Sequence, residues 1–404
     1  MKKTVWLFVG LMFLLGGCCC PSTKEDKNMV TLKALSGEVK RDYAPDRRSR
    51  IWEVTFVEKS QNKGVYIAKG STTQPEAIEA LAALSAEKGV TLLDSICLLP
   101  DPSLGEKTFG ITSLSVTNAR TTPDHSSEMD TQVLMGMPVR ILEQRGSWLR
   151  IVTPEGYISW SNMGVQAMTQ QEYDTWIKSD KVIITTHYTL FREQPSTSAN
   201  VVRDGVWGCM AQYVGEQGAY YKVIIPDGKV AYVPKSDAQK YQEWIKQRNP
   251  VASNIIATGK QFLGFPYLWG GTSIKGLDCS GFVKTCFFLN GVIIPRDASQ
   301  QVKAGEEVDL SNILENLKPA DLLYFGRKAT DTTPERITHT GMYIGNGQFI
   351  HSASTPASVV INSLIPGAPD YSTTAESLVR SKRYIPVIDQ DTDIVSIKNH
   401  PWYQ

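Results

Sequence analysis

The sequence predicts a multidomain α+β protein in which a small α/β unit and two small β-barrels precede a C-terminal α+β domain. Three observations predict this architecture. Residues 29–108 alternate between strand and helix patterns, residues 109–250 contain short strands in two similar copies, and residues 251–386 combine an apolar helix with a hairpin. At about 100–200 residues per domain, the chain is long enough for these units.

Composition narrows the function classes. Apolar residues make up 42% of the 404 residues and charged residues 21%, which are the proportions of folded globular protein. The formal net charge of +1 provides no broad basic field, so nucleic acid is not an expected partner. The nine Trp and sixteen Tyr have flat rings that suit either sugar and peptide binding or the cores of barrels.

The first residues, MKKTVWLFVGLMFLLGGCCC, have the pattern of an export signal in residues 1–17. The apolar run is too short to be a comfortable membrane span. It ends in LGGC, which resembles a bacterial lipobox and implies lipid attachment to Cys18; a plain signal peptide is the alternative. Residues 18–28 are predicted as a polar tether. The chain is therefore expected to be an exported lipoprotein, anchored in the cell envelope on the periplasmic side or at the outer membrane.

Residues 29–108 predict the small α/β unit. RIWEVTFVEKS and GVYIAKG alternate as strands do, and VTLLDSICLLP is expected as a third strand. Between them, STTQPEAIEALAALSAEKG has the signals of a helix, with Pro75 in its first turn and Gly89 as its stop. No chemistry is visible in this unit.

Residues 109–178 and 179–250 predict the two barrels, because short apolar runs alternate there with turns that contain Pro, Gly and Asp. RGSWLRIVTPEGYISW in the first copy aligns with QGAYYKVIIPDGKVAYV in the second, which indicates an internal repeat. MTQQEYDTWIKS and KSDAQKYQEWIKQR are expected as helical links after the barrels.

Residues 251–386 predict the C-terminal domain. SNIIATGKQFLG and CSGFVKTCFFLNG are expected as helices and DLLYFG as a strand. HTGMYIGNGQFIHSAS is expected as a hairpin, whose Gly-Asn-Gly turn tolerates positive φ. Residues 387–404 are assigned to a C-terminal tail.

The stretch GGTSIKGLDCSGFVKTCFFLNG places Cys279 where a glycine-rich loop gives way to an apolar helix. Cysteine attacks as the thiolate, and the amides of a helix N-terminus or a nearby imidazole lower a thiol pKa. His339 and His351 flank the hairpin, so we expect them side by side. A base beside a second imidazole that fixes its tautomer has the logic of a catalytic triad.

Each of these residues also has a structural interpretation, because a lone Cys at a helix start and two His on a hairpin are more often packing or surface residues. Their combination, together with the glycine-rich stretches, favours catalysis. Cys97, Cys209 and Cys286 show no metal-ligand spacing. On one helix Cys279 and Cys286 would lie about 10 Å apart, too far for a disulfide. Neither a metal nor an organic cofactor is expected.

A longer pattern, FPYLWGGTSIKGLDCSGFVKTCFFLNGVIIPRDASQQ followed by THTGMYIGNGQFIHSAS, closely resembles the NlpC/P60 cysteine peptidases over about residues 254–386. The barrels resemble bacterial SH3 domains. Together they resemble the γ-D-glutamyl-L-diamino acid endopeptidases (dipeptidyl-peptidase VI) of that family. The resemblance implies an α+β protein with a papain-like NlpC/P60 catalytic domain, preceded by two SH3-like β-barrels, that hydrolyses cell-wall peptides.

The resemblance also implies residue roles. Cys279 matches the nucleophile, His339 the general base, and His351 the residue that orients His339. The mechanism that the resemblance implies is that Cys279 forms a thioacyl enzyme on the D-glutamyl γ-carbonyl, and that His339 protonates the departing amine and later activates water.

On the substrate side, Tyr267 matches a tyrosine near the oxyanion region. Asp278 and Ser280 match positions that hold the first residue of the substrate and its D-glutamate. Asp297 matches a further acid, and it is followed by Ala298 where the family often has Ser, which removes one polar contact to the substrate.

In this family the first barrel caps the cleft and supplies an acid to a free peptide amine. Glu128 is matched to that acid, with Trp160 or Tyr157 as the nearby wall; a solvated loop acid is the alternative interpretation of Glu128. A capped cleft would accept short peptides with a free L-Ala and reject intact wall, because a blocked amine leaves the acid unsatisfied.

The sequence therefore predicts a lipid-anchored cysteine peptidase that cleaves the γ-D-glutamyl–diamino acid bond of L-Ala-γ-D-Glu-diamino acid muropeptides. The diamino acid is either meso-diaminopimelate or lysine. Two alternatives stay open. One is an endopeptidase that acts on intact peptidoglycan, with the barrels as wall anchors. The other is a non-catalytic wall-binding lipoprotein.

Overall fold

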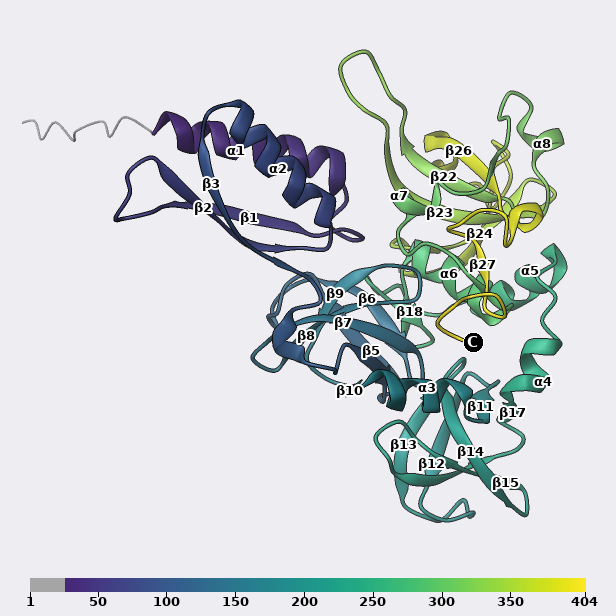
Figure 1. Ribbon diagram of the computed structural model, residues 1–404. Coiled ribbons are helices and arrows are strands. Elements are labelled where there is room, and N and C mark those ends of the chain that lie inside the picture. Colours follow the sequence, from purple (N-terminus) through teal and green to yellow (C-terminus); the bar gives the residue numbers. More distant parts are fainter. Residues whose placement is uncertain (1–25) are drawn as a thin grey trace, which may run out of the picture.

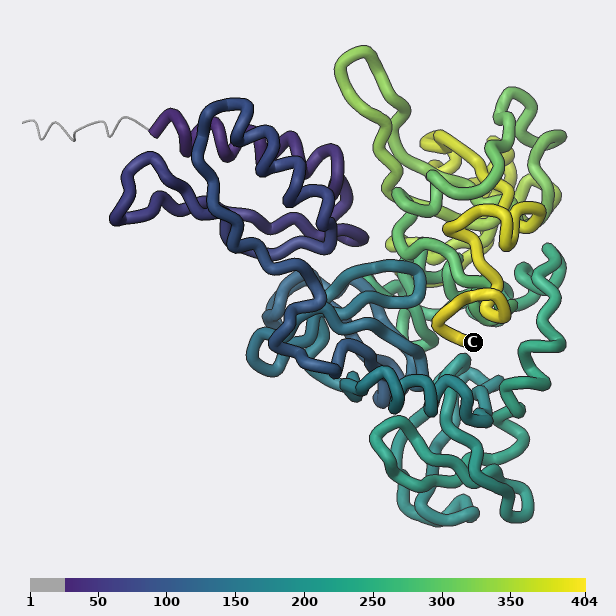
Figure 2. The backbone as a smooth tube through the Cα atoms, in the orientation of Figure 1, coloured from purple at the N-terminus to yellow at the C-terminus, as the bar shows by residue number. Residues whose placement is uncertain are grey.

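The computed structural model describes residues 26–404, so Cys18, the predicted signal peptide and residues 18–25 of the predicted tether lie outside the described residues. Four units follow one another along the chain. Figure 1 shows the first barrel between the N-terminal unit, the second barrel and the C-terminal domain, and the tube of Figure 2 follows the same order. Within residues 26–404, no helix combines the length and the hydropathy that crossing a membrane requires.

The N-terminal unit packs two helices against a three-stranded sheet. Its elements are α1 (Lys27–Tyr43), β1 (Trp52–Glu58), β2 (Val65–Thr72), α2 (Pro75–Glu87) and β3 (Thr91–Leu98). The strand order is β1-β2-β3, with β1 antiparallel and β3 parallel to β2. Both helices share one core with the sheet, centred on Leu35, Trp52, Ala68 and Leu81. The three strands and α2 confirm the predicted elements.

Helix α1 has no counterpart in the prediction, which places residues 27 and 28 in a tether; the structure corrects that boundary. Asp26 caps the helix by accepting a hydrogen bond from a first-turn N–H. Ser36 lies on its buried face and accepts a hydrogen bond from the Trp52 indole (3.0 Å). The apolar stripe of α1 is therefore interrupted by a polar residue, which weakens its periodicity in the sequence.

The two barrels have the same topology. The first contains β4 (Phe109–Thr112), β5 (Val116–Arg120), β6 (Met129–Leu134), β7 (Pro138–Arg145), β8 (Trp148–Val152), β9 (Ile158–Ser161) and β10 (Val165–Met168). The second contains β11 (Lys181–Ile184), β12 (Tyr188–Arg192), β13 (Val201–Val206), β14 (Met210–Gln217), β15 (Tyr220–Ile224), β16 (Val230–Pro234) and β17 (Ala238–Lys240). The orders β10-β4-β7-β8-β9-β5-β6 and β17-β11-β14-β15-β16-β12-β13 correspond strand by strand, which confirms the internal repeat.

An arginine closes the same loop in each copy. Arg120 donates from Nη1 to the carbonyl oxygen of Ser127, and Arg192 donates from Nη1 to that of Ala199, both at 2.6 Å and seven residues along the chain. Helix α3 (Gln170–Lys178) follows the first barrel and α4 (Tyr241–Lys246) follows the second. The second link is shorter than predicted, because residues 238–240 pair as β17 with β11.

The C-terminal domain packs helices against a six-stranded sheet in the order β21-β26-β22-β23-β24-β25. Its helices are α5 (Ala252–Lys260), α6 (Cys279–Leu289), α7 (Ala298–Gln301) and α8 (Ile313–Asn316). Its strands are β18 (Thr272–Ser273), β19 (Gly276–Leu277), β20 (Val292–Ile293), β21 (Glu306–Glu307), β22 (Leu322–Arg327), β23 (Arg336–Gly345), β24 (Gln348–Ala353), β25 (Ser358–Ser363), β26 (Leu378–Arg383) and β27 (Val395–Ser396). Two short 3₁₀ helices, η2 (Thr373–Ser377) and η3 (Ile385–Val387), also belong to this domain, whereas η1 (Pro102–Leu104) lies between the N-terminal unit and the first barrel. The predicted helices, strand and hairpin are confirmed.

Residues 387–404 are part of the fold rather than a free tail. Strand β27 pairs with β20, so the segment first completes the C-terminal domain. It then crosses to the first barrel, where the His400 ring lies 3.0 Å from the carbonyl oxygen of Pro154 and the Tyr173 hydroxyl donates to that of Trp402 (3.1 Å). The Arg140 guanidinium lies 4.7 Å from the centre of the Trp402 ring.

The N-terminal unit is fastened to the first barrel at a small shared core. The side chains of this core are Ile51, Leu99, Leu142 and Ile158. The Arg150 guanidinium pairs with Glu53 across the junction (2.6 Å), and the carbonyl oxygen of Arg48 accepts a hydrogen bond from the N–H of Ile158 (2.7 Å). These contacts hold the loop of residues 44–51 against the barrel, and the ion pair between Arg48 and Asp297 joins the same loop to the C-terminal domain.

Candidate active site

Cys279 is the first residue of α6, as the sequence predicts. Asp278 caps this helix, because its carboxylate accepts hydrogen bonds from the N–H groups of Gly281 (2.6 Å) and Gly270 (2.9 Å). The loop before α6 approaches so closely that a Cβ on Gly281 would lie 2.0 Å from the carbonyl oxygen of Gly271. A residue with a side chain at position 281 would therefore push the loop away from the thiol.

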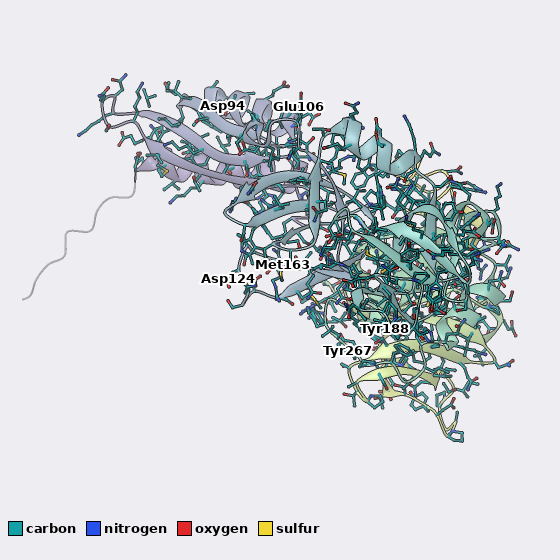
Figure 3. All side chains as sticks on the ribbon, turned by 90° about the horizontal axis from the view of Figure 1, so that it is seen from below. Asp94, Glu106, Asp124, Met163, Tyr188 and Tyr267 are labelled. Atoms are coloured by element: carbon teal, nitrogen blue, oxygen red, sulfur yellow. The ribbon has the colours of Figure 1, made fainter. Side chains whose placement is uncertain are left out.

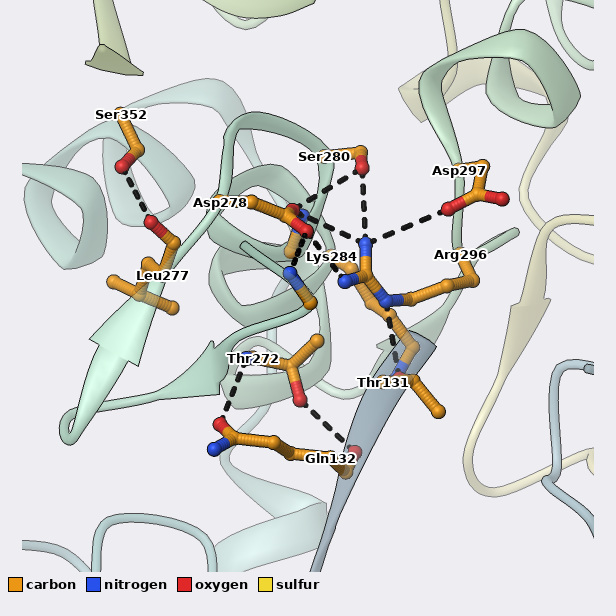
Figure 4. A network of polar contacts seen from close by, with 12 residues as sticks. Thr131, Gln132, Thr272, Leu277, Asp278, Ser280, Lys284, Arg296, Asp297 and Ser352 are labelled. Atoms are coloured by element: carbon orange, nitrogen blue, oxygen red, sulfur yellow. Dashed lines mark hydrogen bonds and ion pairs between the residues drawn. The ribbon is translucent and has the colours of Figure 1, made fainter. Parts of the chain in front are cut away.

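Arg296 lies beneath the start of α6 and is 1% exposed. It pairs with Asp278 (2.6 Å) and donates to the hydroxyls of Ser280 (3.0 Å) and Thr131 (3.0 Å), as Figure 4 shows. The carboxylate of Asp278 and the hydroxyl of Ser280, both predicted to hold substrate, are thus engaged by the scaffold. Arg296 is not among the residues predicted from the sequence, because nothing in PRDASQQ indicates that its arginine is buried.

The two predicted histidines lie side by side. His339 on β23 and His351 on β24 approach to 2.7 Å between Nε2 and Nδ1. His351 Nε2 lies 2.9 Å from Oδ1 of Asn362, whose Nδ2 donates to the carbonyl oxygen of Asp370 (3.1 Å). The amide orientation makes Oδ1 an acceptor, so His351 carries its proton on Nε2.

This chain of hydrogen bonds determines the tautomer of both rings. With its proton on Nε2, His351 accepts at Nδ1, and His339 donates from Nε2. The Nδ1 atom of His339 is then unprotonated, as a base must be. Asn362 was also missed by the sequence analysis; it lies in β25, where the motif that identified the histidines has already ended.

The Cys279 thiol lies next to β23, the strand that carries His339. The backbone N–H of Thr340, the residue after His339, is hydrogen-bonded to the sulfur of Cys279. Burial raises the pKa of the Cys279 thiol to about 12, the charge of Asp278 adds to this, and the N–H groups of Thr340 and Ser280 oppose it. Burial, and secondly His351, lowers the pKa of His339 to about 3.

The expectation that the helix N-terminus and an imidazole lower the thiol pKa is therefore corrected for the resting site. Both groups are neutral there, because burial penalises each charged form more than the local dipoles favour it. Proton transfer from sulfur to imidazole creates two opposite charges together, and these attract each other strongly inside a cavity.

A cavity of about 440 Å³ opens over Cys279. Among the residues predicted from the sequence, those that line it are Glu128, Tyr157, Asp278, Cys279, Ser280, Asp297 and Ala298. Tyr267 lies close enough for the Cys279 charge to act on its hydroxyl; burial first, then that charge, raises its pKa (labelled in Figure 3).

Trp160 does not line the cavity, so the structure corrects its prediction as a wall. Its side chain is buried in the first barrel, with the guanidinium groups of Arg145 and Arg150 at 4.8 and 5.3 Å from its ring centre. Tyr157, the alternative, lines the cavity, and its hydroxyl donates to Asp297 (3.1 Å).

The carboxylate of Asp297, predicted as a substrate-side acid, is engaged by the N-terminal unit as well as by Tyr157. Arg48 Nη1 lies 2.7 Å from Asp297 Oδ2. Ala298, where the resemblance implies a Ser, lines the cavity next to it.

Two further cavity residues were missed. Asp130 on β6 lines the cavity beside Glu128; burial raises its pKa to about 6, and the charge of Arg47 is the largest opposing influence. Trp269 is 60% exposed at the cavity edge. Its position in the glycine-rich stretch PYLWGG was the available signal, because an exposed tryptophan in a loop marks a contact surface.

Hydrogen bonds hold the first barrel against the loop before α6. Gln132 on β6 accepts hydrogen bonds at its side-chain oxygen from the N–H of Thr272 (3.0 Å) and the hydroxyl of Ser273 (2.9 Å). Its carbonyl oxygen accepts from the Thr272 hydroxyl (2.9 Å), also drawn in Figure 4. Since Asp130 precedes Gln132 on the same strand, this clamp fixes its place over the cavity.

No set of three or more His, Cys, Asp and Glu side chains in residues 26–404 is arranged to hold a metal ion. Of the cysteines in this part of the chain, Cys97, Cys209, Cys279 and Cys286 are free thiols.

Replacing Arg296 with Met should lower the free energy of unfolding of the C-terminal domain by about 3–5 kcal/mol, because Asp278 would remain buried without its partner. Urea unfolding followed by tryptophan fluorescence measures this. Arg380→Met is the matched control: this half-exposed residue pairs with Glu335, and its loss should cost less than about 1 kcal/mol. Equal losses in the two variants would contradict the role assigned to Arg296.

Two segments of the chain match known family models. Residues 264–375 match the NlpC/P60 family, and residues 119–160 match the bacterial dipeptidyl-peptidase SH3 domain. The first segment contains Cys279, His339 and His351, and the second contains Glu128 and Tyr157. Both segments lie outside the N-terminal unit.

Relatives extend the match over most of the chain. A γ-D-glutamyl-L-lysine dipeptidyl-peptidase of Bacillus cereus is 32% identical over 271 residues, which cover 65% of this chain and 77% of the relative. Dipeptidyl-peptidase 6 of Lysinibacillus sphaericus is 25% identical, over 62% of this chain and 89% of its own. The crystal structure of an NlpC/P60 family protein from Bacillus cereus superposes with a TM-score of 0.58 at 27% identity, over 69% of this chain and 100% of that one. With the free thiol at the start of α6 and the paired histidines beside it, the chain belongs to the NlpC/P60 family of cysteine peptidases.

Proposed function

We propose that the protein hydrolyses the γ-D-glutamyl–diamino acid bond of cell-wall peptides that carry a free N-terminal L-Ala. One observation carries this proposal: a single cavity joins the Cys279 thiol to the carboxylates of Glu128 and Asp130, which come from the first barrel. The names of the relatives, γ-D-glutamyl-L-lysine dipeptidyl-peptidase and dipeptidyl-peptidase 6, support the same bond and the same release of a dipeptide.

The two barrel carboxylates suit a primary ammonium group. Neither Glu128 nor Asp130 has a salt-bridge partner within residues 26–404; Asp130 accepts only a long hydrogen bond from Ser159 (3.3 Å). A carboxylate in a partly closed cavity gains most from a charged donor that enters with the ligand. Since the barrel residues Glu128, Asp130 and Tyr157 line this part of the cavity, we expect a bound peptide to end there, as a free L-Ala does.

The chemistry follows from the tautomers of the two histidines. As Cys279 sulfur bonds to the γ-carbonyl carbon of D-glutamate, its proton passes to His339 Nδ1, and the carbonyl becomes an oxyanion. The backbone N–H of Cys279, with the Tyr267 hydroxyl beside it, stabilises that oxyanion. His339 then gives its proton to the departing amine as the C–N bond breaks. It next takes a proton from water as the water oxygen attacks the thioester carbon. The C–S bond then breaks, and His339 returns the proton to the sulfur.

The proposal includes export and lipid attachment at Cys18, which places the reaction in the cell envelope, where the enzyme recycles or trims muropeptides. Mass spectrometry of the mature N-terminus tests the anchor: a diacylated or triacylated peptide that starts at Cys18 supports it, and an unmodified N-terminus at another residue refutes it. An endopeptidase on intact peptidoglycan, the alternative within the same class, differs in needing no free amine.

The wild-type protein should release L-Ala-D-Glu from L-Ala-γ-D-Glu-diamino acid at least about 100-fold faster than from the same peptide with its amine acylated, because a blocked amine cannot pair with the carboxylates of Glu128 and Asp130 that line the cavity. Liquid chromatography with mass spectrometry of the products measures this. Cys279→Ala should bind the free peptide without any turnover. Equal rates on the free and the blocked peptide would defeat the amine pocket, and turnover by Cys279→Ala would defeat the thiol chemistry.

Replacing Asn362 with Leu should lower kcat by roughly 10- to 100-fold with little change in KM, because His351 loses the acceptor that fixes its proton on Nε2 and His339 loses its tautomer. Asn362→Asp, which retains an acceptor, should recover most of the rate. Steady-state kinetics with a thermal melt of each variant separates this role from a packing role. A fall in stability with unchanged kcat would show that Asn362 only packs.

The value of kcat/KM for the free peptide should fall about tenfold per pH unit below pH 6. Asp130, whose pKa is raised to about 6, loses its charge as pH falls through that value and no longer attracts the ammonium group. This fall at low pH, the acidic limb of the pH profile, reports a group of the free enzyme, so it appears in kcat/KM rather than in kcat. Asp130→Asn should abolish the limb and Glu128→Gln should keep it; a limb that persists in Asp130→Asn would assign it to another group.

A further inference from the structure

The N-terminal unit reaches the cavity through two adjacent arginines in the loop of residues 44–51. Arg47 and Arg48 both line it, although this unit lies outside both matched family segments. Arg48 is fully engaged: its guanidinium contacts Asp46 (2.8 Å), Asp297 (2.7 Å) and the hydroxyl of Ser299 (3.0 Å). It therefore fastens the loop to the start of α7.

The main chain of the loop is fastened as well. The carbonyl oxygen of Arg48 accepts a hydrogen bond from the N–H of Ile158 in the first barrel (2.7 Å), and Gln300 donates from α7 to Asp46 (3.2 Å). The residue before Arg48 is thus held in place by the barrel on one side and by the C-terminal domain on the other. Arg47 itself has no hydrogen-bond or ion-pair partner among the described residues, and its side chain is exposed at the cavity.

The charges of the cavity divide into two groups. Its charged lining side chains are Arg47, Arg48, Glu128, Asp130, Asp278, Asp297 and Arg336. Arg48 and Asp297 neutralise each other, and Asp278 is neutralised by the buried Arg296. The side chains left for a ligand are the acids Glu128 and Asp130 and the bases Arg47 and Arg336. Such a set complements a zwitterion better than a cation.

The acyl half of the proposed substrate is a zwitterion. L-Ala contributes an ammonium group, and a D-glutamate that is linked through its γ-carboxyl retains a free α-carboxylate. Arg47 is better placed than Arg336 to meet that carboxylate, because its loop is hydrogen-bonded to Ile158 of the first barrel and its charge opposes the raised pKa of Asp130. Arg47 therefore lies on the side of the cavity that holds the ammonium group.

We propose that Arg47, supplied by the N-terminal unit, determines specificity by binding the α-carboxylate of the D-glutamyl residue. The inference rests on the proposed function. The planar guanidinium offers two parallel N–H donors to one carboxylate, and an amide in place of that carboxylate accepts only at its oxygen and presents its own donors to the cation. The protein therefore selects peptides with D-glutamate over those with D-isoglutamine, its α-amide.

The test compares L-Ala-γ-D-Glu-diamino acid with the same tripeptide carrying D-isoglutamine. Wild type should prefer the carboxylate peptide by roughly 10- to 100-fold in kcat/KM. Arg47→Gln should reduce this preference to about one by slowing the carboxylate peptide alone, and a structural defect would slow both peptides equally. Arg50→Gln is the matched control from the same loop, because the Arg50 guanidinium does not line the cavity and donates to the carbonyl oxygen of Tyr43 (3.3 Å).

Calorimetry separates this inference from the proposed reaction. Binding of L-Ala-D-Glu and of L-Ala-D-isoglutamine to wild type and Arg47→Gln gives the same comparison without turnover. Carboxylate-selective binding that Arg47→Gln abolishes supports the inference even if neither tripeptide is cleaved, a result that would refute the proposed reaction alone. Equal binding of the two dipeptides by wild type overturns the inference, and so does selectivity that survives in Arg47→Gln but disappears in Arg336→Gln.

Discussion

The site depends on one buried ion pair, between Asp278 and Arg296. The carboxylate caps α6 and receives the N–H of Gly270, while the guanidinium reaches Ser280 and the barrel hydroxyl of Thr131. A buried charge requires a partner, so this ion pair holds together the loop before α6, the segment before α7 and strand β6. The nucleophile and the barrel wall of the cavity are positioned by the same two charges.

A second chain of contacts runs from the carbonyl oxygen of Asp370 through Asn362 and His351 to His339. It uses neutral groups, so it sets the location of protons without placing a charge in the cavity. Charge separation between sulfur and imidazole is then confined to the moment of reaction. Pre-set donors and acceptors need no rearrangement at that moment, which is how a buried site lowers the barrier.

Local patterns were enough to predict the helix that begins at Cys279 and the hairpin that brings His339 to His351, because both signals lie within a few residues of the side chains they position. Short apolar runs between turns predicted the two barrels, and the family resemblance identified the C-terminal domain as an NlpC/P60 domain; the structure and the comparisons confirm both. Arg48 and Asp297, by contrast, pair across 249 residues, and Arg296 and Thr131 across 165. No periodicity or spacing reports contacts of that kind.

Two other misses have local physical causes. Helix α1 carries Ser36 on its apolar face, so its amphipathic pattern is broken where the core accepts a hydrogen bond. The thiol pKa was predicted from the helix N-terminus and a nearby imidazole, which leaves out the burial that outweighs both. Both errors come from inferring an environment from a residue's neighbours in sequence rather than in space.

The aromatic contacts of Trp402 and His400 with the first barrel have a consequence for how ligands arrive. After the C-terminal domain, the chain returns to the first barrel, which residues 400–402 contact. The N-terminal unit contacts the same barrel through the ion pair between Glu53 and Arg150. A multidomain enzyme with free linkers can swing open around a polymer. In this protein, contacts on both sides hold the domains to the first barrel, so we expect the cavity to keep its width when a ligand enters and to admit ligands according to their size.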